Sequence, residues 1–108
     1  MSTYVLVESR DPFDSPDTSF LADTAAALKK RGNDVTVFLV QNAVLAARKH
    51  ARKSDLPQLV QWGVTVMADD FSLRERGIAP DNLIGGVKAA PIDAVVERMA
   101  AGWNALWH

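Results

Sequence analysis

Seven consecutive residues, Asp34–Val40, form a nearly continuous apolar run. Because the apolar side chains do not alternate with polar ones, the run predicts a strand that is buried on both faces. Such strands occur mainly in parallel sheets, whose crossover connections place helices over the sheet. The run therefore predicts an α/β protein with a mostly parallel sheet.

The rest of the chain alternates further short apolar runs with segments of helical spacing. Residues 5–7 and 64–68 predict two more strands, and residues 87–89 a shorter one. After Gly102, the aromatic segment Trp103–Trp107 favours a terminal edge strand over a continued helix. The predicted helices are a first one capped by Ser15 or Asp17 and running to Arg31, then residues 43–50, 59–62, 71–76 and 91–101. This alternation predicts an open sheet of parallel strands with right-handed crossovers.

Two of these helices carry apolar stripes, which predict the faces that they bury against the sheet. In the first helix the stripe comprises Phe20, Leu21, Thr24, Ala25 and Leu28. In the last helix it comprises Ile92, Val95, Val96, Met99 and Ala100.

Length and composition limit the classes of protein to which the chain belongs. A chain of 108 residues predicts a single domain over residues 1–108. It has no cysteine, which excludes disulfides, thiolate metal sites and thiol nucleophiles. The net charge of −1 gives no general attraction for nucleic acid. No apolar stretch is long enough to span a membrane and the start lacks a signal-peptide pattern, so we expect a soluble, cytoplasmic protein.

The ligand crevice of an open α/β sheet lies at the carboxyl ends of its strands. The loops that follow the first three predicted strands supply Arg10, then Gln41 and Asn42, then Asp69 and Asp70. We expect these five side chains to form the binding site, with Asp69 facing the crevice and Asp70 capping the next helix. Asn42 is also a candidate cap for the second helix.

Other candidate sites have simpler interpretations. The acids Asp11, Asp14 and Asp17 together with Asp69 and Asp70 could hold Mg²⁺, but turn and cap roles are the favoured explanation, so no metal site is assigned. Gly85-Gly86 lacks the pattern of a phosphate-binding loop, and neither His50 nor His108 belongs to a visible triad or metal-ligand spacing. No cofactor is therefore expected.

Two further groups of residues concern partners. The basic run of Arg48, Lys49, His50, Arg52 and Lys53 has no interleaved aromatic residue, which favours a solvated helix end over a nucleic-acid contact. Trp103 and Trp107 lie near the last residue, with little chain around them, and are candidates for a subunit interface.

The segment from Gly63 to Ile78 resembles the strand, loop and short helix of the DsrE/DsrF-like sulfur-relay proteins. Residues 11–28 resemble the first loop and helix of that family, residues 37–47 its second strand and the helix after it, and residues 87–106 its closing elements. The resemblance implies a flavodoxin-like three-layer sandwich with about five strands. It also implies homo-oligomers, often trimers or hexamers, or hetero-oligomers with related subunits.

The resemblance also locates a missing residue. The family's persulfide-carrying cysteine falls eight residues before Gly77, where this chain has Asp69. A carboxylate oxygen is hard and weakly nucleophilic, so direct sulfur transfer by this chain is excluded. We expect a non-catalytic member that uses the crevice to bind a ligand or partner protein. Two alternatives remain: an enzyme or metal-binding protein in which Asp69 acts as general base or cation ligand, and an inert module.

Overall fold

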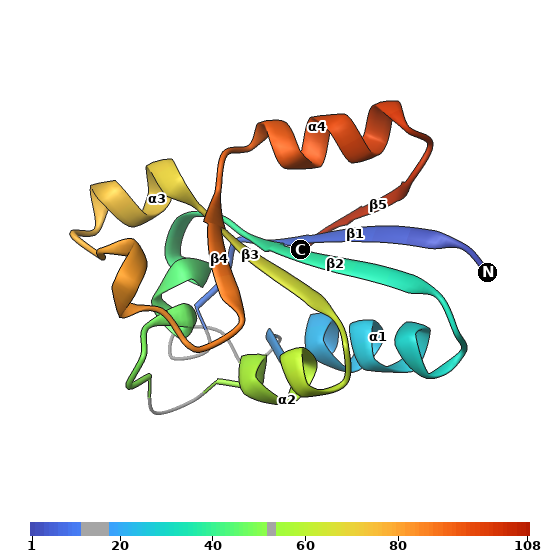
Figure 1. The fold of residues 1–108 in the computed structure, drawn as a ribbon, viewed down its shortest axis with the longest axis horizontal. Coiled ribbons are helices and arrows are strands. Elements are labelled where there is room, and N and C mark those ends of the chain that lie inside the picture. Colours follow the sequence, from blue (N-terminus) through green and yellow to red (C-terminus); the bar gives the residue numbers. More distant parts are fainter. Residues whose placement is uncertain (12–17, 52–53) are drawn as a thin grey trace.

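The computed structural model describes residues 1–11, 18–51 and 54–108, which form one sheet with helices on both faces (Figure 1). The strands are β1 (Thr3–Glu8), β2 (Asp34–Leu39), β3 (Thr65–Asp69), β4 (Val87–Ala90) and β5 (Asn104–Trp107). The α-helices are α1 (Thr18–Lys30), α2 (Leu56–Gln61), α3 (Asp70–Glu75) and α4 (Asp93–Ala100). Two 3₁₀ helices, η1 (Gln41–Ala47) and η2 (Pro80–Asn82), lie in the connections. The caps predicted at Ser15 or Asp17, and the basic residues Arg52 and Lys53, fall outside the described residues.

Every strand pairing is parallel, and the sheet order is β4-β3-β2-β1-β5. This confirms the predicted parallel α/β sheet and the predicted edge strand after Gly102. The run that predicted the fold is the central strand: Val37 lies opposite Leu6 of β1 on one side and Val66 of β3 on the other. Its apolar side chains, Val35 to Leu39, are buried on both faces.

Helices α1 and α2 cover one face of the sheet and α4 covers the other (Figure 1). Alternate residues of β1 divide between the two cores, because Leu6 faces α1 while Val5 and Val7 pack with Val95 of α4. The chain moves from β1 to β4 along one direction of the sheet, and α4 then returns it to β5 beside β1. Within the described ranges, no helix has the length and apolar character needed to cross a membrane.

The predicted apolar stripes are only partly correct. On α1, Leu21 and Ala25 are buried as expected, but Phe20 is 62% exposed and its ring lies 5.6 Å from that of His108. On α4, only Val95 of the predicted stripe is buried, whereas Ile92, Val96 and Met99 point to solvent. The sheet is instead met by Arg98, whose Nε donates to Thr36 Oγ1 at 3.3 Å and whose guanidinium lies 5.2 Å from the Trp103 ring centroid.

The second predicted helix also differs from the structure. It is a 3₁₀ helix that begins at Gln41 and is preceded by Val40, with no side-chain cap. The prediction that Asn42 caps this helix is therefore wrong, and its amide oxygen instead accepts from Arg76.

Candidate functional site

A shallow cavity of about 470 Å³ lies at the carboxyl edge of the sheet, on the side of α4. We call it the edge pocket. It is formed where β2, β3 and β5 end, and it brings together Gln41, Asn42 and Asp69, three of the five predicted binding residues. Phe71, Ser72, Arg76 and Trp107 also line the pocket. The expected crevice is therefore present, but two of the five predicted residues do not line it.

Asp69 is the last residue of β3 and the N-cap of α3. Its Oδ2 accepts hydrogen bonds from the backbone N–H of Ser72 at 3.0 Å and from Ser72 Oγ at 2.7 Å. The side chain is almost buried, with 8% of its surface exposed. The prediction that Asp70 caps this helix is wrong: β3 continues one residue further than expected, so Asp69 both caps α3 and faces the pocket.

Ser72 links the ends of two strands. Its hydroxyl donates to Asp69 and accepts from the backbone N–H of Gln41 at 2.8 Å. Gln41 has a φ of 52°, which places it in the left-handed region that a residue with a side chain rarely adopts. The serine bond thus holds an unfavourable backbone conformation where β2 leaves the sheet.

Arg76 closes the same loop from the other end of α3. Its Nε and Nη2 donate to Asn42 Oδ1 at 3.1 and 3.0 Å, and its Nη1 donates to the Ser72 carbonyl at 3.2 Å. The planar guanidinium is thereby fixed at the pocket wall.

Two exposed aromatic side chains line the outer part of the pocket. Phe71 is 57% exposed and Trp107 is 64% exposed. Trp103, the other predicted interface tryptophan, is partly buried against Val5, Val7 and Phe38 and is covered by Arg98. Of the two predicted interface tryptophans, Trp107 is therefore the one that exposes a large apolar surface in the single chain.

Arg10 and Asp70, the remaining predicted binding residues, do not line the edge pocket. Arg10 borders a separate cavity of about 40 Å³ on the side of α1 and α2. Asp70 is partly exposed in the first turn of α3. Residues at one edge of a sheet can still point to opposite faces, which separates Arg10 from Asp69.

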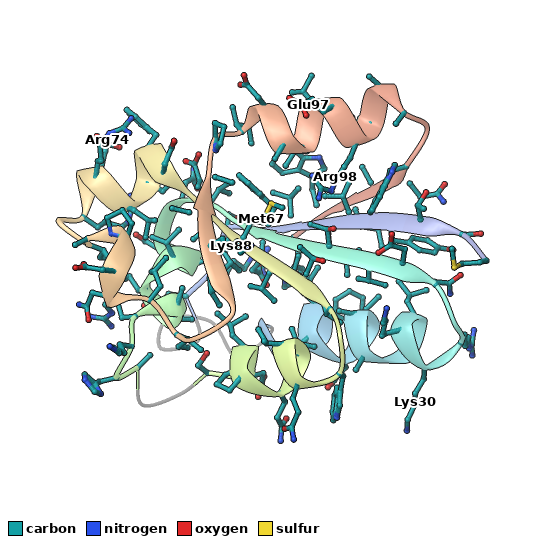
Figure 2. All side chains as sticks on the ribbon, viewed as in Figure 1. Lys30, Met67, Arg74, Lys88, Glu97 and Arg98 are labelled. Carbon is teal, nitrogen blue, oxygen red and sulfur yellow. The ribbon has the colours of Figure 1, made fainter. Side chains whose placement is uncertain are left out.

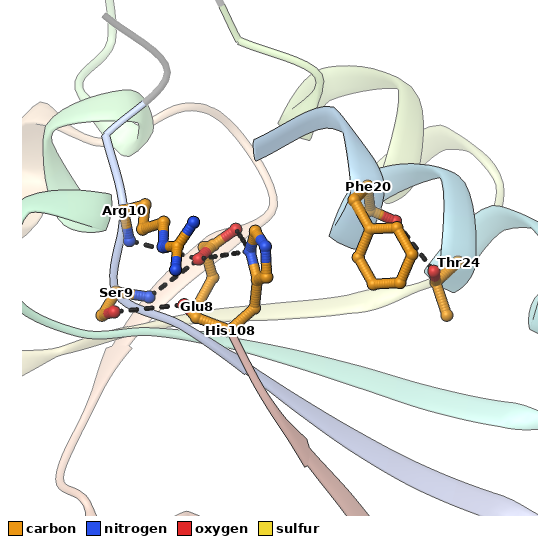
Figure 3. A network of polar contacts seen from close by, with 6 residues as sticks. All are labelled: Glu8, Ser9, Arg10, Phe20, Thr24 and His108. Atoms are coloured by element: carbon orange, nitrogen blue, oxygen red, sulfur yellow. Dashed lines mark hydrogen bonds and ion pairs between the residues drawn. The ribbon is translucent and has the colours of Figure 1, made fainter. Parts of the chain in front are cut away.

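A second polar network, around Glu8, was missed by the sequence analysis (Figure 3). The Glu8 carboxylate is 5% exposed and accepts from the backbone N–H groups of Ser9 at 3.0 Å and Arg10 at 3.1 Å. The Nδ1 atom of His108 lies 2.9 Å from Glu8 Oε1, and Ser9 Oγ donates to the His108 carbonyl at 3.2 Å. The one sign of this network in the sequence is that Glu8 and His108 each directly follow a predicted strand. Nothing in the sequence shows that these two strands are neighbours.

The model of the DsrE/DsrF-like family matches residues 2–107. The chain belongs to the DsrE/DsrF-like family. No significant match is found among curated proteins by sequence.

Solved structures agree with this DsrE/DsrF-like fold. The ychN protein from E. coli superposes with a TM-score of 0.88 at 20% identity, covering 100% of both chains. MTH1491 from Methanobacterium thermoautotrophicum, described as a protein of unknown function, gives 0.85 at 20% identity, again over 100% of both chains. BT1422 from Bacteroides thetaiotaomicron, also described as of unknown function, gives 0.69 at 20% identity over 98% of this chain and 95% of that one. At this identity the likeness establishes the fold.

The edge pocket of this DsrE/DsrF-like chain has few groups for metal chemistry. Among residues 1–11, 18–51 and 54–108, no three His, Asp or Glu side chains are close enough together to hold a metal ion. Asp14 and Asp17 of the acidic set considered above fall outside these ranges. The described part of the pocket is thus equipped with hydrogen-bonding groups and aromatic surface.

Replacing Asp69 with alanine is expected to lower the free energy of unfolding by about 2 kcal/mol. About half comes from the lost helix cap, and the rest from leaving the buried Ser72 hydroxyl without its acceptor. Urea unfolding followed by circular dichroism measures this change. The control is Asp70→Ala, expected to cost about 0.5 kcal/mol because Asp70 makes only a first-turn charge interaction. Equal losses in the two variants would contradict the assignment of Asp69 as the cap.

Proposed function

We propose that this chain is a non-catalytic DsrE-like module that binds a partner protein or small ligand in the edge pocket, in a sulfur-relay context. We further propose that it assembles into a homo-oligomer or with related subunits. The observation that carries the proposal is the role of Asp69: at the position of the carrier cysteine, the chain has a carboxylate that caps α3.

The bonding of Asp69 argues against a catalytic role. A general base needs a free lone pair that can reach a substrate proton. Asp69 Oδ2 already accepts two hydrogen bonds, which leaves Oδ1 alone for a substrate, and the side chain is nearly buried. The chain also has no cysteine to carry sulfur in its place. The residue thus retains the loop geometry of the site and supplies no thiol.

The surface of the pocket supports a binding role. Phe71 and Trp107 expose apolar rings beside the fixed guanidinium of Arg76. Exposed aromatic side chains next to oriented polar groups are typical of protein interaction sites. A partner segment with an apolar side chain and a hydrogen-bond acceptor would match both kinds of group.

Affinity capture with the immobilised wild-type chain tests the proposal. We expect a specific bound protein or metabolite, identified by mass spectrometry, whose recovery falls at least about tenfold for Trp107→Ala, since a buried tryptophan contact is commonly worth 2 kcal/mol or more. Asp81→Ala, an exposed residue of η2 outside the pocket, is the matched control and should retain binding. A strict monomer that retains no ligand or partner would contradict the proposal.

Calorimetric titration with Mg²⁺ and Mn²⁺ tests the alternative in which Asp69 is a cation ligand. The proposal expects no difference between the wild-type chain and Asp69→Asn, whose amide oxygen can still cap the helix. Cation binding by the wild type that disappears in Asp69→Asn would instead favour the metal-binding alternative.

A further inference from the structure

The outer face of α4, together with Ile92 at its N-cap, carries an apolar stripe that the described residues do not cover. Ile92, Val96 and Met99 are 42%, 59% and 48% exposed. Their spacing of four and three residues puts them on one side of the helix. A stripe of this kind, directed away from its own core, is typical of a helix that packs against another protein surface.

The charges beside the stripe are acidic. Asp93 and Glu97 are exposed on α4, whereas Arg98, its only basic residue, turns toward the sheet and donates to Thr36 and to the Ala94 carbonyl. Figure 2 shows Glu97 on the outer side of α4 and Arg98 on the side of the sheet. The outer face of α4 thus presents apolar side chains flanked by negative charge.

The opposite face of the molecule has a groove of about 540 Å³ between α1 and α2. Its α1 wall contains the small residues Ala22, Ala26 and Ala27, which leave room for inserted side chains. One end of the groove is bordered by Lys29, Lys30 and the half-exposed Trp62.

The other end of the groove is acidic. Asp23 lies two turns before Lys30 on α1, and Asp55 precedes the first residue of α2. Seven helical residues span about 10 Å, so the groove has separate acidic and basic ends.

We propose that α4 of one copy of this chain docks into the α1–α2 groove of the next copy. Ile92, Val96 and Met99 would pack against the alanines and Trp62. Asp93 and Glu97 would lie near Lys29 and Lys30, while repulsion from Asp23 and Asp55 sets the direction of the docked helix. The inference rests on the homo-oligomer of the proposed function and names the surfaces that form it.

The two surfaces lie on opposite sides of the sheet. In Figure 2, Glu97 projects above α4 and Lys30 projects below α1, on the far side of the molecule. Two copies therefore cannot exchange both contacts around a twofold axis, and each contact leaves one helix and one groove free. A head-to-tail contact of this kind gives a closed ring or a filament. We therefore expect at least three copies in a closed assembly.

Two variants, each with one surface damaged, test this arrangement. The groove variant is Lys29→Glu/Lys30→Glu, and the helix variant is Val96→Gln/Met99→Gln. Mass is measured by size-exclusion chromatography with light scattering, and circular dichroism verifies that each variant is folded. Each variant alone should fall from the wild-type assembly to the mass of one chain, 11.8 kDa, a decrease of at least threefold. Arg31→Glu/Arg74→Glu, which makes the same charge change at two exposed positions outside the groove, should keep the wild-type mass.

An equimolar mixture of the two variants provides the decisive result. The intact α4 of the groove variant fits the intact groove of the helix variant, and the remaining two surfaces are both damaged. The mixture should therefore give a one-to-one dimer and nothing larger. Variants that retain the wild-type mass, or a mixture that stays monomeric, overturn the assigned surfaces while leaving the homo-oligomer in place. A monomeric wild type removes the homo-oligomer itself.

Discussion

The Asp69→Cys variant is expected to take up one sulfur atom from a small-molecule persulfide, whereas the wild-type chain, which has no cysteine, takes up none. The variant thiolate attacks the terminal sulfur of the donor persulfide, the donor S–S bond breaks, and the donor leaves as a thiolate. Position 69 precedes α3. In the wild-type chain the backbone N–H of Ser72 donates to Asp69, and in the variant the same N–H would face the cysteine sulfur. Thiolates are favoured at helix N-termini, which raises their reactivity. The intact mass of the variant, measured after removal of the donor, reports the added sulfur.

The neighbouring variant Asp70→Cys is the control for position. It has the same composition, but its thiol lies within the first turn of α3 and outside the edge pocket. We expect it to take up sulfur several times more slowly. Equal rates at the two positions would show that residue 69 has no special environment for sulfur, and would remove the chemical link between this site and the family's carrier position.

Gly86→Ala is expected to lower the free energy of unfolding by about 3 kcal/mol. Gly86 has a φ of 91°, a conformation that costs an L-residue roughly 1–2 kcal/mol. A Cβ atom at this position would also lie 2.4 Å from Val60 Cγ1 of α2, so the Val60 side chain or the backbone at residue 86 must shift, at a further cost of about 1–3 kcal/mol. Urea unfolding gives the difference from the wild type.

Gly102→Ala separates the two causes of this loss. Gly102 has nearly the same φ, 92°, but no atom lies within 4 Å of where its Cβ would be. It should therefore lose only the backbone part, about 1–2 kcal/mol. Adding Val60→Ala to Gly86→Ala should make the alanine at 86 cost no more than the one at 102. Equal losses for Gly86→Ala and Gly102→Ala would show that the close approach of Val60 has no energetic effect.

The sheet was predictable because its signals are local. The apolar run of β2 depends only on neighbouring residues, and the structure places it at the centre of the sheet, within one residue of its predicted end. The helices predicted over residues 59–62 and 71–76 end within one residue of their predicted ends, because Gly63 and Gly77 follow them with the positive φ that stops a helix.

The buried faces of the helices were less predictable. An apolar stripe shows which side of a helix is apolar, but it does not show what covers that side. Phe20 follows the predicted period, but it lies in the first turns of α1 and contacts His108, which is far away in sequence. Arg98 of α4 faces the sheet because its guanidinium contacts Thr36 and Trp103 there. Thr36 is distant from the helix in the sequence, and the apolar spacing of the helix gives no sign that Arg98 and Trp103 meet.

The candidate site was predicted in part for the same reason. Gln41, Asn42 and Asp69 meet at the edge pocket, as expected from parallel strands that end together. The capping residue was misplaced because β3 extends through Asp69, a difference of a single residue that sequence patterns do not resolve. The pairing of Glu8 with His108 depends on the adjacency of the first and last strands, which is a property of topology.

That adjacency also affects how the protein is made. Residues Tyr4 to Val7 of β1 pair on one side with Asn104 to Trp107 of β5, which leaves the ribosome after the other four strands of this sheet. During synthesis β1 is therefore an open sheet edge with a very apolar sequence, and it remains so until β5 has been made. Ribosome-bound chains that stop before β5 should accordingly be more prone to aggregation and proteolysis than chains that include it, because β5 is the element that covers this edge of β1.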